Sequence, residues 1–225
     1  LSCSLSNVIK IGTTITLTGS NTYWGQKTNV TAKIVDENNI AMNGVTLTLN
    51  GTNNTTDSQG TATFTITMGD KADVTTSYKC TYAGNDKYKN SEKSISLTTQ
   101  KRPVTITTKH PTGTSSSNPV YKSWELKYVV KDSVDGSTVI SSPTVAIYVD
   151  GNKQTTSYTS STGTIKCSMP NLGASDGKTT KVKCSFSHSN YVSKTTSEQS
   201  VYYISYKTFL RVPTHFANNQ SLTGG

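Results

Sequence analysis

The sequence lacks the short motifs by which most enzymes are recognised. It contains no G-x-S-x-G elbow, no P-loop, no dinucleotide-binding glycine pattern and no H-E-x-x-H. Only 13 Asp and Glu are present among 225 residues, and most fall in turn-like segments, so a catalytic carboxylate pair has few candidates. We therefore expect no enzymatic activity, no catalytic residue and no cofactor.

Long apolar runs are also missing. No stretch approaches the roughly 20 apolar residues that a membrane-spanning helix needs. The N-terminus has neither the basic start nor the apolar middle of a signal peptide. These absences predict a mature fragment without a membrane span.

Histidine is scarce, which bears on metal binding. His110, His188 and His215 have no second histidine or acidic cluster at metal-ligand spacing, so we expect solvated loop histidines and no metal site. Two acidic turns, residues 36–39 and 132–135, carry hard oxygen ligands of the kind that calcium prefers. Ordinary turn formation explains both turns as well, because Asp and Asn side chains cap local backbone.

The four cysteines are far apart and form no C-x-x-C pair, which excludes a zinc ribbon and a thioredoxin-type motif. Two alternatives remain, buried thiols and disulfides. Cys167 and Cys184 flank a hairpin-like segment and could face each other across a sandwich, and Cys3 and Cys80 would form the corresponding bridge in the first half of the chain.

Lys and Arg number 22, giving a formal net charge of +9. They are spread along the chain, with no run longer than Lys101-Arg102 and no aromatic-basic signature of an RNA-binding module. We expect non-specific attraction to anionic surfaces and no specific nucleic-acid partner.

Threonine and serine are what the sequence has instead, at 70 of 225 residues, against an apolar share of 32%. Many segments alternate threonine with an apolar residue, as in Thr13 to Thr18, Val45 to Leu49 and Ala62 to Met68. Period-two alternation predicts half-buried strands, and turn pairs such as Asn50-Gly51 and Asp150-Gly151 separate them. About seven strands can be counted in each half, which predicts an all-β immunoglobulin-like sandwich twice over.

The chain also repeats internally, which fixes its organisation. Matching segments recur in the same order 97 to 104 residues apart: 20–23 with 117–121, 49–51 with 149–151, 60–64 with 163–167, and 80–82 with 184–186. We predict a first domain over 1–100, a second over 101–206, and a C-terminal extension or linker over 207–225. Pro103 favours a short, stiff junction, so that the two domains would form a rod.

Residues 78–91 carry a family resemblance. A strand ending in the aromatic Tyr82 leads through Gly84-Asn85 to Tyr88 and then a small residue, and Gly60-Thr61-Ala62-Thr63-Phe64 precedes it. This pattern resembles the tandem bacterial and archaeal Ig-like (Big-type) repeats of adhesin-like surface proteins, including those of methanogens. The second copy keeps the aromatics in residues 186–191 but lacks the glycine. The resemblance covers about residues 7–205 and implies the fold, with little about a ligand.

The cellular location and the binding partners are indicated by sequons and by aromatic residues. Five N-x-Ser/Thr sequons, at Asn29, Asn50, Asn53, Asn54 and Asn219, favour an extracellular, glycosylated surface. The aromatics Tyr23, Trp24, Tyr121 and Trp124 are expected in the core rather than in a sugar-stacking platform.

Two functions remain open. The first is a non-enzymatic stalk or spacer in cell-surface attachment, whose partners are neighbouring Ig-like domains and an unidentified glycan or protein of a host or cell surface. The second is an assembly module of a filament or virion appendage, in which residues 207–225 add as a strand to a neighbouring subunit.

Overall fold

The computed structural model describes residues 9–205, except for 113, 116–118, 122–123 and 174–176. Over this part of the chain every regular element is a β-strand, so it has no helix that could cross a membrane. Two compact units are formed. The first combines Leu1–Thr105 with Asp132–Ser137 and Ser187–Ser193, and the second holds Ile106–Lys131, Thr138–Phe186 and Lys194–Gly225.

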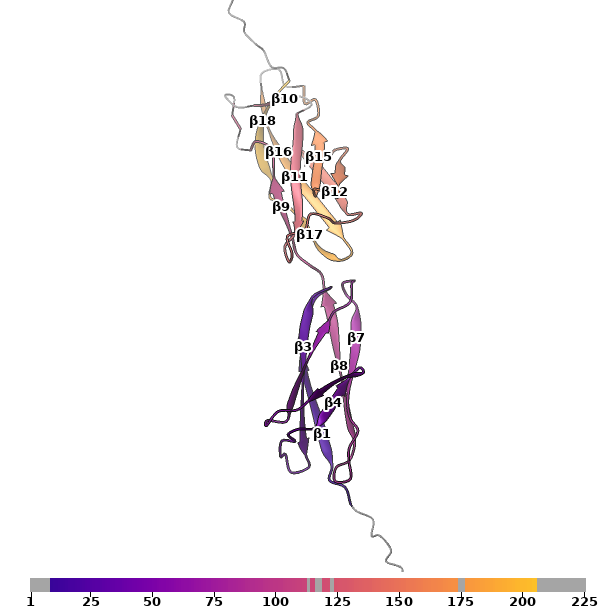
Figure 1. The fold of residues 1–225 in the computed structure, drawn as a ribbon. Helices are drawn as coiled ribbons and strands as arrows, with labels where there is room; N and C mark the ends of the chain where they lie inside the picture. The colour runs from indigo at the N-terminus through magenta and orange to yellow at the C-terminus, as the bar shows by residue number, and fades with distance from the viewer. Residues whose placement is uncertain (1–8, 113, 116–118, 122–123, 174–176, 206–225) are drawn as a thin grey trace, which may run out of the picture. The chain divides into compact units, whose positions relative to one another are not determined.

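The first half of the chain forms one β-sandwich (Figure 1). Its strands are β1 (Thr13–Gly19), β2 (Thr22–Tyr23), β3 (Lys27–Asp36), β4 (Thr46–Leu49), β5 (Thr52–Thr55), β6 (Thr61–Thr67), β7 (Thr75–Tyr82) and β8 (Ser91–Gln100). One sheet has the order β1-β3-β6, and the other has the order β2-β8-β7-β4-β5. All pairs are antiparallel except β2 with β8, so the predicted sandwich is confirmed.

Alternation of apolar residues with threonine explains these strands. In β6 the side chains of Ala62 and Phe64 are buried while those of Thr63 and Thr65 are exposed, and Leu47 and Leu49 are buried in the same way in β4. The core of this sandwich consists of Ile15, Val30, Ala32, Ile34, Met42, Leu47, Leu49, Ala62, Phe64, Met68, Cys80, Tyr82 and Leu97.

The second half forms another sandwich with the same plan. Its strands are β9 (Val104–Thr108), β10 (Val120–Tyr121), β11 (Glu125–Asp132), β12 (Thr144–Val149), β13 (Asn152–Lys153), β14 (Ser157–Thr159), β15 (Thr164–Ser168), β16 (Lys178–His188), β17 (Tyr191–Thr195) and β18 (Gln199–Ile204). One sheet has the order β14-β15-β11-β9 and the other β10-β18-β16-β12-β13, with β17 beside β16.

Equivalent hydrogen bonds in the two sandwiches confirm the internal repeat. The amide of Ile34 donates to the carbonyl of Gly60 at 2.9 Å, and that of Val130 donates to Gly163 at 2.9 Å. The short parallel pair β2 with β8 recurs as β10 with β18. The two copies therefore share register as well as order.

Candidate functional site

Arg102, in the junction after β8, is the most deeply buried basic residue among the described ones, with 4% of its surface exposed. Its guanidinium Nη1 donates to Asp132 Oδ2 at 3.0 Å and to Asp135 Oδ2 at 2.6 Å. Its Nε donates to the carbonyl of Trp24 at 3.1 Å, and its Cζ lies 3.9 Å from the Trp24 ring centroid. All of these residues belong to the first compact unit.

The two acids hold Arg102 in its charged form. Burial disfavours that charge, but the hydrogen bonds that Arg102 donates to Asp132 and Asp135 outweigh this effect and raise the pKa of Arg102. Asp132 is itself 1% exposed, and its other oxygen accepts the Val134 amide at 2.7 Å. The Ser137 amide and then Arg102 lower the pKa of Asp135. A charged, fully partnered group of this kind is a structural element.

Asn190, in the turn before β17, and Tyr191, the first residue of β17, complete this Arg102 cluster. Tyr191 packs edge-on against Trp24 with ring centroids 5.7 Å apart. Burial and its contact with Asp132 raise the pKa of the Tyr191 phenol. The carbonyl of Asn190 accepts the Trp24 indole Nε1 at 2.8 Å, and its Oδ1 accepts the Ala72 amide at 3.2 Å. Trp24 is thus packed and bonded, but it is half-buried and lies in this cluster rather than in the hydrophobic core that we expected.

The carboxylates of both acidic turns have hydrogen-bond partners within the protein. Asp132 and Asp135 face Arg102, while Asp36 Oδ1 accepts the amides of Asn38 and Ile40 at 2.9 and 3.0 Å. Within the described residues no three His, Cys, Asp or Glu side chains come together as a metal site. The turn interpretation therefore accounts for these carboxylates.

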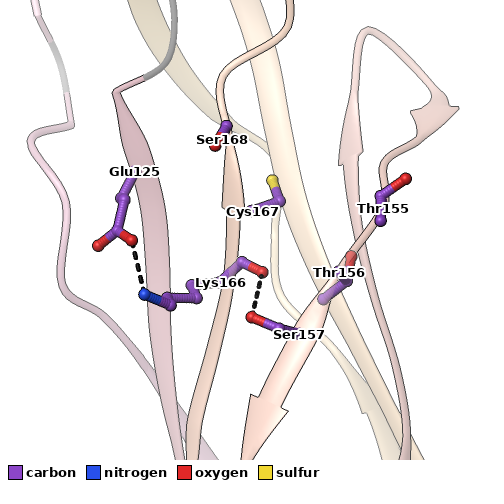
Figure 2. Close-up of a pocket in the computed structure, with 7 residues that line it drawn as sticks. All are labelled: Glu125, Thr155, Thr156, Ser157, Lys166, Cys167 and Ser168. Atoms are coloured by element: carbon purple, nitrogen blue, oxygen red, sulfur yellow. Dashed lines mark hydrogen bonds and ion pairs between the residues drawn. The ribbon is translucent and has the colours of Figure 1, made fainter.

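The second unit contains a hollow of about 320 Å³, shown in Figure 2. Across it, Lys166 Nζ lies 2.6 Å from Glu125 Oε1, and this ion pair lowers the pKa of Glu125. Ser157 Oγ donates to the carbonyl of Lys166 at 3.3 Å. The lining residues are Glu125, Thr155, Thr156, Ser157, Lys166, Cys167 and Ser168.

No nucleophile in this hollow is activated. Burial raises the pKa of the Cys167 thiol to about 11, so it stays protonated at neutral pH. Ser157 bonds to a backbone carbonyl rather than to a histidine or carboxylate, which a catalytic serine would need. The hollow is therefore a polar surface with no acyl-transfer or hydrolytic arrangement.

Of the two alternatives for the cysteines, buried thiols and disulfides, the structure has buried thiols at the three described cysteines. Cys167 on β15 and Cys184 on β16 lie on opposite sheets of the second sandwich, yet both are free, buried thiols, as is Cys80. Burial raises the pKa of Cys184 to about 12, with Cys167 adding to the effect. The structure has both as separate thiols packed as small apolar groups, and a disulfide between them stays a prediction. Cys3 lies outside the described residues.

His110 is not the solvated loop residue that we expected. It is 8% exposed, its Nδ1 accepts the Lys127 amide at 3.0 Å, and its ring packs edge-on against Tyr128 at 4.8 Å. Burial lowers its pKa. His188 is half-buried and accepts the Asn190 amide at 3.0 Å, while His215 lies outside the described residues.

The sequons of the first sandwich are exposed. Asn29, Asn50 and Asn53 each accept a hydrogen bond through Oδ1. Asn54 instead donates from Nδ2 to the carbonyl of Thr63 at 2.8 Å. Glycosylation remains a prediction, with Asn54 the least suitable acceptor. Asn219 lies outside the described part of the chain.

Tyr121 and Trp124 depart from the expected core position. Their rings stack with centroids 5.7 Å apart and 6° between the planes, and 37% of Trp124 is exposed. Trp124 precedes β11 instead of lying within it. The predicted strand over Trp124 to Val130 therefore starts one residue later.

Comparison with known proteins gives fold-level similarity. No protein-family model and no characterised protein matches the sequence. Among solved structures, Sidekick-1 immunoglobulin domains 1–5 match with 12% identity and a TM-score of 0.35, over 86% of this chain and 39% of that one. The Yersinia pseudotuberculosis adhesin InvE matches with 18% identity and a TM-score of 0.34, over 84% and 58%.

Domains 5–6 of the S-layer protein SbsC match with 14% identity and a TM-score of 0.27, over 86% of this chain and 97% of theirs. This chain thus spans less than two thirds of the Sidekick-1 and InvE structures. At these identities and TM-scores the similarities carry no information about a ligand or partner.

Proposed function

We propose that this chain is a non-enzymatic structural module of an extracellular, adhesin-like surface protein, acting as a stalk or spacer in cell-surface attachment. Its domains would be 1–100 and 101–206, with 207–225 as an extension or linker, and its partners would be neighbouring Ig-like domains. The observation that carries the proposal is the buried Arg102 cluster at the junction of the two repeats.

The segment that joins the two repeats in the sequence is held in place within the first compact unit, and the Arg102 cluster supplies a physical cause. Breaking a buried ion pair by removing one partner typically costs about 3–5 kcal/mol, because an unpaired charge is left in a low-dielectric site. The amide of Arg102 also donates to the Asn190 carbonyl at 3.1 Å, and its carbonyl accepts the Val192 amide at 2.9 Å. Main chain and side chain of one junction residue are thus both fixed, and Pro103 limits the next dihedral.

Trypsin provides a direct test, because the Lys101-Arg102 bond lies in the junction. In the intact chain we expect slow cleavage there, and in Arg102→Met we expect cleavage after Lys101 to be about tenfold faster or more, since the segment opens more often. Lys71→Met, in an exposed turn, serves as the control and should leave this rate unchanged. Equally rapid cleavage in all three proteins would show that the junction is not held.

Small-angle scattering separates the spacer from the assembly function. If the chain is a spacer, it should be a monomer. Removing residues 207–225 should then shorten its maximum dimension by no more than the length of that segment. Polymers that disappear on this truncation would favour strand addition between subunits instead. Residues 207–225 lie outside the described part of the structure.

A further inference from the structure

Three lysines form a row across neighbouring strands on the outer face of the sheet β14-β15-β11-β9. Lys127 of β11 lies directly opposite Lys166 of β15 in the antiparallel register. Lys109, which directly follows β9, donates its amide to the Lys127 carbonyl at 2.8 Å and is therefore its neighbour on the other side. Neighbouring strands lie about 4.8 Å apart, so the three positions fall within about 10 Å.

The first sandwich has threonine at all three corresponding positions. Val30 pairs with Phe64 there as Leu126 pairs with Cys167 in the second sandwich, which aligns Lys127 with Thr31 and Lys166 with Thr63. The next strand places Thr18 opposite Thr31. One chain therefore contains the same ladder with a neutral row and with a cationic row.

The cationic row is unfavourable for the sheet itself. Like charges directly opposite each other destabilise an antiparallel pair. Among the described residues, Glu125 forms an ion pair with Lys166 and also interacts electrostatically with Lys127, whereas no carboxylate lies within ion-pair distance of Lys109. The surrounding charge does not compensate, because residues 101–206 carry 12 Lys and Arg against 6 Asp and Glu, while residues 1–100 carry 8 against 7. Because repulsion between these lysines destabilises the sheet, the row indicates a binding site for a ligand of opposite charge.

The rest of this face indicates which anion fits. Apart from Val129, Glu125 and Lys131, the other outward side chains of this face carry hydroxyl groups. These hydroxyl-bearing residues are Thr105, Thr107, Ser157, Thr159, Thr164 and Ser168. No aromatic ring lies on it to stack nucleic-acid bases, and no apolar cluster is present to anchor a protein. Lys166 and Ser157 also line the hollow of Figure 2, so the row leads into a concave, hydroxyl-lined surface.

We propose that this face, defined by Lys109, Lys127 and Lys166, binds a linear polysaccharide that carries sulfate or carboxylate groups. The lysines contact the anionic groups and the serine and threonine hydroxyls bond to the sugar. Charge attraction of this kind is screened by salt, so binding weakens as ionic strength rises. The site adds a binding function to the second sandwich that the spacer function does not require.

The test uses the full chain and two probes, a heparin oligosaccharide for sulfate and an alginate oligosaccharide for carboxylate. At physiological ionic strength we expect one or both to bind, and K109T/K127T/K166T to weaken that binding by about tenfold or more. The control K153T/K178T/K181T removes the same charge from the other sheet and should change affinity by less than about threefold. K109R/K127R/K166R keeps the charge and should retain binding, and melting curves verify that each variant is folded.

Gain of function provides a further arm. T18K/T31K/T63K copies the row onto the first sandwich and should add a second, weaker binding site. The proposal is overturned if neither polysaccharide binds the parent chain, or if the two lysine-to-threonine triples weaken binding equally, since net charge alone would then explain it. Single-stranded DNA that competes through the same lysines with equal or higher affinity would also overturn it, in favour of a nucleic-acid surface.

Discussion

Asp132 occupies the same turn position as Asp36, 96 residues earlier in the chain. The amide of Asp36 donates to the Ile40 carbonyl at 3.0 Å, and that of Asp132 donates to Ser137 at 2.8 Å. In each turn Oδ1 accepts the amide two residues later, at 2.9 and 2.7 Å. The difference is Oδ2, which in Asp132 accepts the Arg102 guanidinium. The same turn thus occurs in both repeats, with Arg102 as a buried counter-ion at Asp132 and without that counter-ion at Asp36.

This pair makes a matched mutational test. Asp132→Asn keeps the turn acceptor but removes the charge that faces Arg102, and we expect a loss of about 2–4 kcal/mol, with Asp135 limiting the damage. Asp36→Asn should cost less than about 1 kcal/mol, because the turn bonds survive. Urea unfolding of the full-length variants measures both values. Equal losses would mean that the Arg102 pair contributes nothing beyond the turn.

The sequence was sufficient to predict the strands because threonine alternates with buried residues and because the repeat doubles every signal. Leu47, Leu49 and Phe64 are buried as predicted, and the Asn50-Gly51 and Asp150-Gly151 turns have positive φ values of 44° and 86°, and 46° and 80°. Such local patterns decide which face of a strand enters the core.

Residues whose partners are distant could not be predicted in the same way. Arg102 looked like an ordinary charged linker residue, because its acids lie 30 and 33 positions away. His110 follows an alternating strand, but the Lys127 amide that it caps is 17 residues away. Whether the Cys167 and Cys184 thiols are joined depends on geometry across two sheets, which spacing does not encode. The internal repeat predicts that the fold occurs twice. It cannot predict the partners of Arg102 and His110, because these contacts occur in one copy only.

His110 predicts a dependence of stability on pH. Burial lowers its pKa in the folded state below its ordinary value near 6.5, so the neutral ring is favoured by folding. Stability is therefore complete above about pH 6.5 and is lost as the pH falls through that value toward the folded pKa. Unfolding by urea at pH 7.5 and at pH 5 should show a lower free energy of unfolding at pH 5.

Substitution separates His110 from the other titrating groups. His110→Ala should cost about 1–3 kcal/mol at pH 7.5, because it opens a cavity beside Tyr128 and leaves the Lys127 amide without its acceptor. The difference in the free energy of unfolding between pH 7.5 and pH 5 should be smaller in this variant than in the parent chain. The more exposed His188→Ala should keep the full difference, and an unchanged difference in His110→Ala would assign the acid sensitivity to another group.

The cysteines predict the reactivity of the folded chain. In Cys3→Ser, the thiols of Cys80, Cys167 and Cys184 should react very slowly with iodoacetamide at pH 7.5, because burial raises the pKa of each. After unfolding in urea without reductant, mass spectrometry should find three modified cysteines. One modified cysteine with Cys167 and Cys184 linked would show that the expected disulfide forms in the protein.

Gly84, which the family resemblance singled out, provides the sharpest test of a turn. Its φ is 79°, and a Cβ there would lie 2.8 Å from both the Asn90 nitrogen and the Tyr88 oxygen, which are backbone atoms that cannot move aside cheaply. Gly84→Val should therefore cost about 3 kcal/mol or more, through backbone strain together with this overlap.

Two controls isolate the causes of that loss. Gly44 has a φ of 72° but no atom within 4 Å of a built Cβ, so Gly44→Ala should show the strain alone, about 1 kcal/mol. Ser187, the counterpart of Gly84 by the repeat offset, lies within β16 and not in a left-handed turn, so Ser187→Val should change stability by less than about 0.5 kcal/mol. Thermal melts of the three variants would contradict this account of the turn if Gly84→Val were no more destabilising than Gly44→Ala.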